Sequence, residues 1–196
     1  KAGILDGMNG TGAYFVGKDP GFTLVADINA GYETPEQFTA WFWEGGGVEL
    51  AREIYGQHGV YYVGPVMWGA ESIPTKEPIS TVAEFEGVKM RSPEGIGAAL
   101  WRKVGVGVST LPGSEVYTAL ERGKIEATDW GTLGMNDELG YDKIAPYAIY
   151  PGIHSVGSAD ISINLDTWNA LPDDLKAIIE TAVKELNRDS LMANAV

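Results

Sequence analysis

The sequence predicts an α/β protein with a layer of parallel strands. Between residues 88 and 128 the local patterns follow the order strand, helix, strand, helix, strand, which is typical of a doubly wound parallel sheet. A long helix is predicted from Asp173, because leucine, isoleucine and valine recur there at helical spacing. The short apolar run Val60–Val63 is rich in β-prone residues and predicts a buried strand.

The clearest helix start lies at Thr34. Threonine suits the N-cap, Pro35 suits the first helical position, and Gln37 stands three residues after the cap, as in a capping box. Three glycines at 45–47 end this helix, because each glycine costs about 1 kcal/mol against alanine in a helix interior. A second helix is expected at residues 48–55.

The remaining elements follow from similar local signals. A first strand is expected at residues 3–8, followed by a glycine-rich stretch as far as Pro20. After Val63 we expect a loop with three prolines that carries Met67, Trp68 and Glu71. The later strands are expected at 88–91, 106–111, 125–128 and 160–164. The later helices are a short one capped by Ser80 or Thr81, one at 96–104, one at 114–122 and the long final helix. Ser114 is expected to cap the helix at 114–122 and Gly123 to end it.

Composition excludes several classes of function. The chain has 196 residues with 27 acidic against 14 basic side chains, and its net charge of −13 repels nucleic-acid backbones. It contains no cysteine, which excludes disulfides and thiol chemistry. No apolar run approaches the roughly 20 residues of a membrane-spanning helix.

Both ends of the sequence look internal. Residues after Lys1 read as a strand already under way, and the last residues stop within a helical pattern that lacks a glycine or proline stop. We therefore expect the sequence to be a segment of a longer protein.

Arg91 is the first candidate binding residue. It ends a predicted strand and precedes Ser92-Pro93 and a new helix, and an open α/β sheet binds ligands at the carboxyl ends of its strands. Its guanidinium group matches a carboxylate with two parallel hydrogen bonds. The alternative is a surface arginine that pairs with one of the many acidic residues.

Asp129 and Trp130 follow the end of another predicted strand. A buried carboxylate must be paired, protonated or bound to a metal, and an indole ring supplies an apolar wall with one N–H donor. The alternative is that Asp129 caps the next helix and Trp130 is a core residue.

Weaker candidates lie elsewhere in the chain. Trp68 is a candidate wall of a binding site, although tryptophan is more often a packing residue. Tyr14 and Lys18 are further candidates, and His154 follows Pro151-Gly152 in a turn, where it either faces a cleft or is exposed. His58, near a helix end, is interpreted as an exposed loop residue.

Enzyme signatures are mostly missing. The sequence lacks a G-x-S-x-G elbow, an H-E-x-x-H motif, a Walker A loop and a cysteine nucleophile. With only two histidines, a metal site would need oxygen donors, which favours calcium, sodium or magnesium over zinc.

Several motifs in this order resemble the substrate-binding proteins of TRAP transporters (DctP family), in the branch associated with 2-oxo acids and related small carboxylates. The resemblance runs over nearly the whole chain. It rests on Arg91 together with the segments Gly17-Lys18-Asp19-Pro20, Trp41–Leu50, Leu111–Tyr117, Ala119–Gly123, Asp129-Trp130, Tyr150-Pro151-Gly152 and Leu171–Leu175.

The resemblance implies a two-lobed fold of the type II periplasmic-binding-protein kind, with parallel-rich sheets, a long C-terminal helix and the N-terminal portion of lobe I missing. On this basis we expect residues 1–64 and 130–158 to form lobe I in part, and residues 65–129 and 159–196 to form lobe II. The ligand would lie in the cleft between the lobes.

The resemblance also implies a non-catalytic, periplasmic receptor that passes a 2-oxo or 2-hydroxy acid to TRAP membrane permease subunits. Arg91 would bind the carboxylate, and Trp130, Asp129, Trp68, His154 and Tyr14 would line the site. No cofactor is required, but a calcium or sodium ion held at Asp129 and Trp130 would bridge to the ligand, and a homodimer is a candidate assembly.

Two rival interpretations remain open on the residues alone. The first is a metal-assisted lyase or hydrolase that uses Asp129 and His154 as an acid and base pair. The second is a structural interaction domain whose cleft binds no small molecule.

Overall fold

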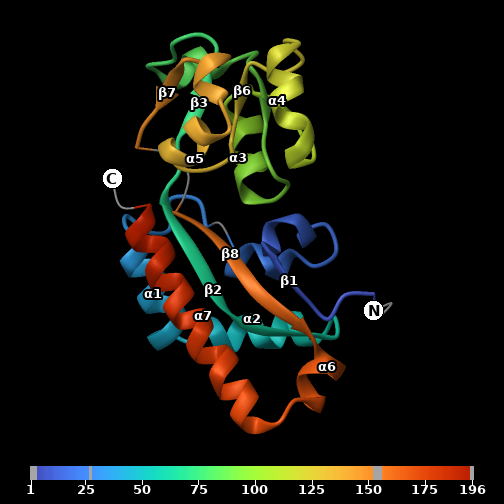
Figure 1. The fold of residues 1–196 in the computed structure, drawn as a ribbon. Coiled ribbons are helices and arrows are strands. Elements are labelled where there is room, and N and C mark those ends of the chain that lie inside the picture. The colour runs from blue at the N-terminus through green and yellow to red at the C-terminus, as the bar shows by residue number, and fades with distance from the viewer. Residues whose placement is uncertain (1–3, 27, 152–155, 195–196) are drawn as a thin grey trace. The chain divides into compact units, whose positions relative to one another are not determined.

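The computed structural model describes residues 4–26, 28–151 and 156–194 (Figure 1). The contacts divide the chain into two compact units. Unit 1 comprises residues 1–27, 32–69 and 156–196, and unit 2 comprises residues 28–31 and 70–155. Among the described residues, none of the helices combines the length and the hydrophobicity that a membrane span requires.

The units divide the chain differently from the expected lobes. Residues 130–155 fall into unit 2, where strand β7 (Tyr147–Ile149) pairs with β3 (Ile73–Thr75). Residues 159–196 fall into unit 1, because β8 (Val156–Asn164) pairs with β1 (Gly7–Gly10). The expected boundaries were drawn from local patterns, which do not reveal which distant strands pair.

Unit 1 is built on a three-stranded sheet with the order β1-β8-β2, in which β1 is antiparallel to β8. Successive residues of β2 (Val60–Ala70) face opposite sides. Tyr61 stacks on Trp168, whereas Tyr62 packs against Phe42 and Tyr55. The helices are α1 (Pro35–Glu44), α2 (Gly47–Gly56), α6 (Leu165–Ala170) and α7 (Asp173–Ala193), with 3-10 turns η1 (Gly12–Phe15) and η2 (Pro20–Val25).

Strand β2 is longer than predicted. The expected proline-rich loop after Val63 is wrong in its first part, because the strand continues through Pro65 to Ala70. Proline cannot donate to a strand ladder, but β2 lies at the edge of its sheet, where this donor is not needed. Trp68 therefore belongs to a strand and not to a loop.

The predicted start of α1 is confirmed. The Thr34 hydroxyl accepts a hydrogen bond from the Gln37 amide at 3.3 Å. The Gln37 side chain reaches back to the amide of Glu33 at 3.0 Å, one residue before the cap. Helix α2 begins after Gly46, whose φ of +91° is the left-handed conformation that glycine tolerates.

Unit 2 is built on a five-stranded sheet with the order β5-β4-β6-β3-β7. Strand β4 (Lys89–Arg91) runs parallel to β5 (Gly107–Ser109) and β6 (Ala127–Thr128), which confirms the predicted parallel layer. β3 is antiparallel to both of its neighbours. The other elements are α3 (Ile96–Lys103), α4 (Gly113–Glu121), α5 (Leu133–Glu138), η3 (Val82–Phe85) and η4 (Tyr141–Lys143).

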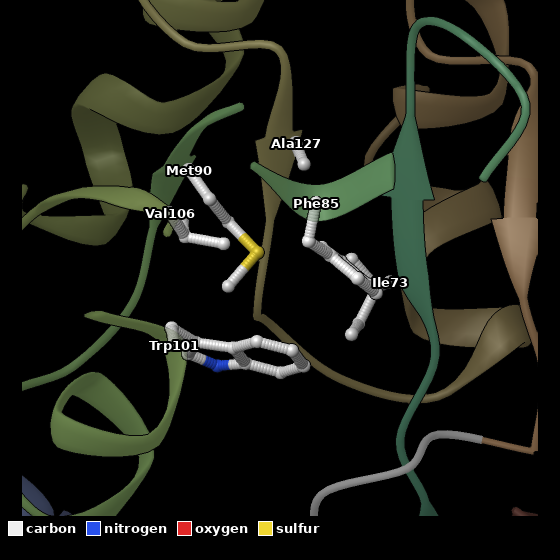
Figure 2. Close-up of a cluster of buried hydrophobic side chains, with 6 residues drawn as sticks. All are labelled: Ile73, Phe85, Met90, Trp101, Val106 and Ala127. Atoms are coloured by element: carbon white, nitrogen blue, oxygen red, sulfur yellow. The ribbon is translucent and has the colours of Figure 1, made fainter. Parts of the chain in front are cut away.

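The core of unit 2 joins the sheet to α3. Met90 of β4 and Trp101 of α3 are almost completely buried. Figure 2 shows that the side chains of the cluster point toward one another from separate segments of the chain. The cluster consists of Ile73, Phe85, Met90, Trp101, Val106 and Ala127.

The start of α4 differs from the prediction. Its N-cap is Pro112, which makes no side-chain cap hydrogen bond, and Ser114 lies inside the helix. The predicted stop is confirmed, since Gly123 adopts φ +67° directly after the last turn.

Candidate functional site

The carboxyl ends of β4 and β6 lie side by side because the two strands are parallel. Arg91 is in register with Thr128, so the residues that follow, Ser92 and Asp129, leave the same edge of the sheet. The Asp129 amide donates to the Arg91 carbonyl at 2.9 Å. The prediction that Arg91 and Asp129-Trp130 lie near one another agrees with this placement.

Arg91 is buried, with an exposed fraction of 2%. Its Nη1 donates to the Asp129 carbonyl at 2.6 Å, and its Nε donates to the Leu111 carbonyl at 3.3 Å. Within the described residues, both guanidinium hydrogen bonds go to backbone carbonyls, and Arg91 forms no ion pair with a carboxylate. A buried charge is costly unless it is paired, and this site therefore favours an anion.

Trp130 forms one wall beside this guanidinium group. The Arg91 Cζ atom lies 5.0 Å from the centre of the Trp130 ring, a distance that suits a cation–π interaction. The ring is partly buried and packs against the core of α4 and Tyr141. Residue 113 must be small, because a Cβ atom there would overlap the Trp130 ring.

Asp129 is also buried, at 6% exposed. Its Oδ2 accepts a hydrogen bond from the Ser92 hydroxyl at 2.9 Å. The alternative that Asp129 caps the next helix is wrong, because Thr132 is the N-cap of α5 and accepts from the Met135 amide. The carboxylate is therefore held at the strand ends by the Ser92 hydroxyl.

Sequence reasoning missed three polar residues of unit 2 as site candidates. All three are buried: the exposed fraction is 3% for Glu71, 0% for Ser72 and 4% for Asn136. The Ser72 amide donates to the Gly131 carbonyl at 2.9 Å, which brings Glu71 next to the segment that follows Asp129. No local motif marks these residues, because their burial depends on a pairing between segments 59 residues apart.

The weaker candidates lie elsewhere. Trp68 belongs to unit 1, where it lies against Gly157, and a Cβ atom at position 157 would overlap its ring. Tyr14 lies on η1 of unit 1 and is 59% exposed. His154 lies outside the described residues. The structure thus brings together Arg91, Asp129 and Trp130 in one unit.

Lys18 and His58 line a cavity inside unit 1. His58 is not the exposed residue expected, because its ring stacks on Phe22 and its Nε2 lies 3.3 Å from the Asp19 carboxylate. The cavity has a volume of about 430 Å³ and is lined by Met8, Phe15, Lys18, Phe22, Tyr55, His58, Val60 and Ser162.

A buried acid lies on β8 in the same unit. Asp160 is 3% exposed and accepts a hydrogen bond from the Tyr55 hydroxyl at 2.7 Å. Burial raises the pKa of Asp160 to about 6, although the hydrogen bond from the Tyr55 hydroxyl opposes the shift. This group responds to pH but is not part of the Arg91 site of unit 2.

The oxygen atoms near Arg91 could coordinate a hard cation such as calcium only if a bound molecule supplied further oxygens. In the described part of the chain, no group of three or more histidine, cysteine, aspartate or glutamate side chains could hold a metal ion. Calcium takes six to eight oxygen ligands. The Asp129 carboxylate could therefore hold such an ion only with backbone oxygens and oxygens of the bound molecule.

Comparison with known proteins finds relatives over nearly the whole chain. Residues 1–195 match the family model described as bacterial extracellular solute-binding protein, family 7 (DctP). A monocarboxylate 2-oxoacid-binding periplasmic protein of Nostoc sp. is 33% identical over 189 residues, which cover 95% of this chain and 51% of that protein.

Two solved structures of TRAP periplasmic solute-binding proteins share the fold. The protein of Pseudoalteromonas atlantica, with bound sodium and pyruvate, is 30% identical with a TM-score of 0.84 and is matched over 98% of this chain and 60% of its own. The protein of Bordetella bronchiseptica, a dimer with calcium and picolinate in one site, is 29% identical with a TM-score of 0.84. The match covers 98% of this chain and 57% of that protein's chain.

The chain spans about half the length of the curated relative and about 60% of the solved chains. The family model nevertheless covers all but one residue. With the α/β units and the buried arginine at a strand end, this match shows that the chain belongs to the DctP family of TRAP solute-binding proteins.

Proposed function

We propose that this chain contributes the carboxylate site of a periplasmic TRAP solute-binding protein that captures a small 2-oxo or 2-hydroxy acid. The observation that carries the proposal is the burial of Arg91, whose described hydrogen bonds both go to backbone carbonyls. A carboxylate ligand would supply the missing negative charge. Relatives described as binding pyruvate or 2-oxo acids support this class.

In this proposal Trp130 packs against the ligand, and Trp68, Tyr14 and His154 supply further contacts from the rest of the protein. The Asp129 carboxylate and the Trp130 backbone carbonyl would hold a calcium or sodium ion together with ligand oxygens. Such an ion would offset the negative charge that the ligand and Asp129 bring into one site. Two solved relatives contain such an ion with a carboxylate ligand, which supports this arrangement.

The proposed role is transport and not catalysis. Membership of a solute-binding family favours a receptor over the metal-assisted lyase or hydrolase. The receptor would work in the periplasm and deliver its ligand to TRAP permease subunits. A homodimer is the assembly proposed for it, supported by one dimeric relative and testable by light scattering.

The test is calorimetric titration of pyruvate, with calcium present, into the wild type and the variants Arg91→Lys and Arg91→Ala. Lysine keeps the charge but loses the planar fork, and alanine loses both. We expect Arg91→Lys to weaken binding by about 1.5–3 kcal/mol and Arg91→Ala to abolish it.

Arg102→Ala is the matched control, since Arg102 is an exposed arginine of the same unit, paired with Glu94. It should leave the affinity unchanged. Equal affinity for pyruvate in the wild type and Arg91→Ala would refute the assignment of Arg91.

A further inference from the structure

Asn136 of α5 links two segments that meet beside the candidate site. Its Nδ2 donates to the Ser72 hydroxyl at 2.9 Å and to the Gly131 carbonyl at 3.0 Å. The side chain is 4% exposed, so water does not compete for these bonds. Asn136 thereby connects the segment before β3 to the segment after β6.

The orientation of this amide group follows from its partners. The Gly131 carbonyl can only accept, so the Asn136 atom beside it must be the NH₂ group and not the oxygen. The remaining atom, Oδ1, is buried and has no hydrogen-bond partner among the described residues. A buried acceptor without a hydrogen bond lowers the stability of the fold, so the presence of asparagine here indicates that its two N–H donors are needed.

The Gly131 carbonyl receives three donors at one point. Besides Asn136 Nδ2, it accepts from the Ser72 amide at 2.9 Å and from the Ser72 hydroxyl at 3.4 Å. These bonds fix the backbone one residue after Trp130 and one residue after Glu71. They therefore restrain the residues on which the proposed ligand and cation depend.

We propose that Asn136 is a positioning residue for the carboxylate site, acting through the Ser72–Gly131 bridge to hold Trp130 and Asp129 in place. The inference rests on the proposed function. In metal sites, loss of a group that orients the ligating residues typically costs about 10- to 100-fold in metal affinity or activity. We expect Asn136→Ala to weaken pyruvate binding, measured by calorimetry with calcium present, by about tenfold or more.

Two further variants distinguish positioning from general loss of stability. Asn136→Asp keeps the shape but places an acceptor against the Gly131 carbonyl, so it should weaken binding as much as Asn136→Ala. Ser72→Ala removes one of the two partners and should cause a smaller loss. In the double variant Asn136→Ala/Ser72→Ala the losses should be less than additive, because both act on one bridge.

Thr75→Val is the structural control. Thr75 is buried in the same unit, and its hydroxyl donates to the Glu77 carbonyl at 2.7 Å and not to Ser72, Gly131 or Asn136. This variant should lower the melting temperature but leave the affinity for pyruvate within about twofold, because it leaves the Ser72–Gly131 bridge intact. An Asn136→Ala protein that is folded and binds pyruvate as the wild type does would overturn the proposal.

A readout without ligand separates this proposal from the proposed function. In the amide spectrum of the free protein, Asn136→Ala should shift the signals of Trp130, Gly131 and Glu71, whereas Thr75→Val should not. Unchanged signals at these three residues would overturn the positioning role. If Asn136→Ala shifts these signals but the wild-type protein binds no pyruvate, the bridge is supported and only the proposed function is overturned.

Discussion

Arg91 and Asp160 are both buried ionisable residues, but they lie in different surroundings. Arg91 is hydrogen-bonded to two carbonyls and keeps its charge, because a guanidinium group does not lose its proton in proteins. Asp160 faces the Tyr55 hydroxyl, while its Oδ2 has no hydrogen-bond partner among the described groups. The arginine therefore needs an anion, whereas the aspartate can become neutral.

The pKa of Asp160 leads to a prediction about stability. Because burial raises the pKa from 3.8 to about 6, the folded protein keeps a proton between these values that the unfolded chain releases. Stability should therefore fall as the pH rises from about 4 to about 6 and stay reduced above. Asp160→Asn removes this penalty and should stabilise the protein at pH 7 by on the order of 2 kcal/mol.

Urea unfolding of the wild type and Asp160→Asn across this pH range checks the prediction. The asparagine can still accept from Tyr55, and its NH₂ group gives a donor to a region where the Tyr62 hydroxyl also lacks a partner. The difference in free energy of unfolding between the wild type and Asp160→Asn should shrink toward pH 4. A constant difference at all pH values would show that the charge is not responsible.

Among the elements, β2 and α7 show how one edge of the unit 1 sheet is completed. Pro65 has no N–H group, and the Met67 amide donates to the side chain of Asn187 on α7 at 2.8 Å. Helix α7 also packs Val183 and Ile179 against the sheet beside Trp168. A side chain of this helix thus satisfies one amide of an edge strand that, in the described part of the chain, has no further strand beside it.

Replacement of Asn187 by leucine should destabilise the protein. The Met67 amide would remain buried without a partner, at a cost of about 1–3 kcal/mol. Glu185→Ala on the exposed side of the same helix is the control and should change stability by less than about 0.5 kcal/mol. Chemical denaturation measures both, and equal stabilities of Asn187→Leu and the control would contradict the role of this bond.

For the whole molecule, net charge and ligand charge have to be considered together. The chain carries −13, and a carboxylate ligand adds to this negative charge. If Asp129 holds a cation only with the help of ligand oxygens, the cation and the ligand must strengthen each other's binding by the same factor. The burial of the Asp129 carboxylate favours this coupling, because a cation would offset its charge.

We therefore expect pyruvate to bind about 5- to 150-fold more tightly with calcium than with a chelator, and calcium to bind more tightly by the same factor when pyruvate is present. Paired calorimetric titrations measure both factors. Asp129→Asn should reduce the coupling, and Arg102→Ala should not. Equal affinity for pyruvate in calcium and in chelator would exclude a shared ion.

Local sequence signals predicted much of the fold because they depend on near neighbours. Thr34, Pro35 and Gln37 specify a helix start without reference to the rest of the chain. The alternation of strands and helices across residues 88–128 implies parallel strands, and parallel strands place Arg91 and Asp129 at one edge. The family could be recognised from the order of such motifs.

The tertiary structure alone decided which distant segments meet. The division into units depends on β8 pairing with β1 and β7 with β3, and no local pattern determines such pairings. The burial of Glu71, Asn136 and Asp160 likewise depends on neighbours far along the chain. The sequence by itself determined the start of α1, the parallel layer and the candidate arginine. Long-range packing decided which polar groups lie beside that arginine, because burial is a property of the folded chain.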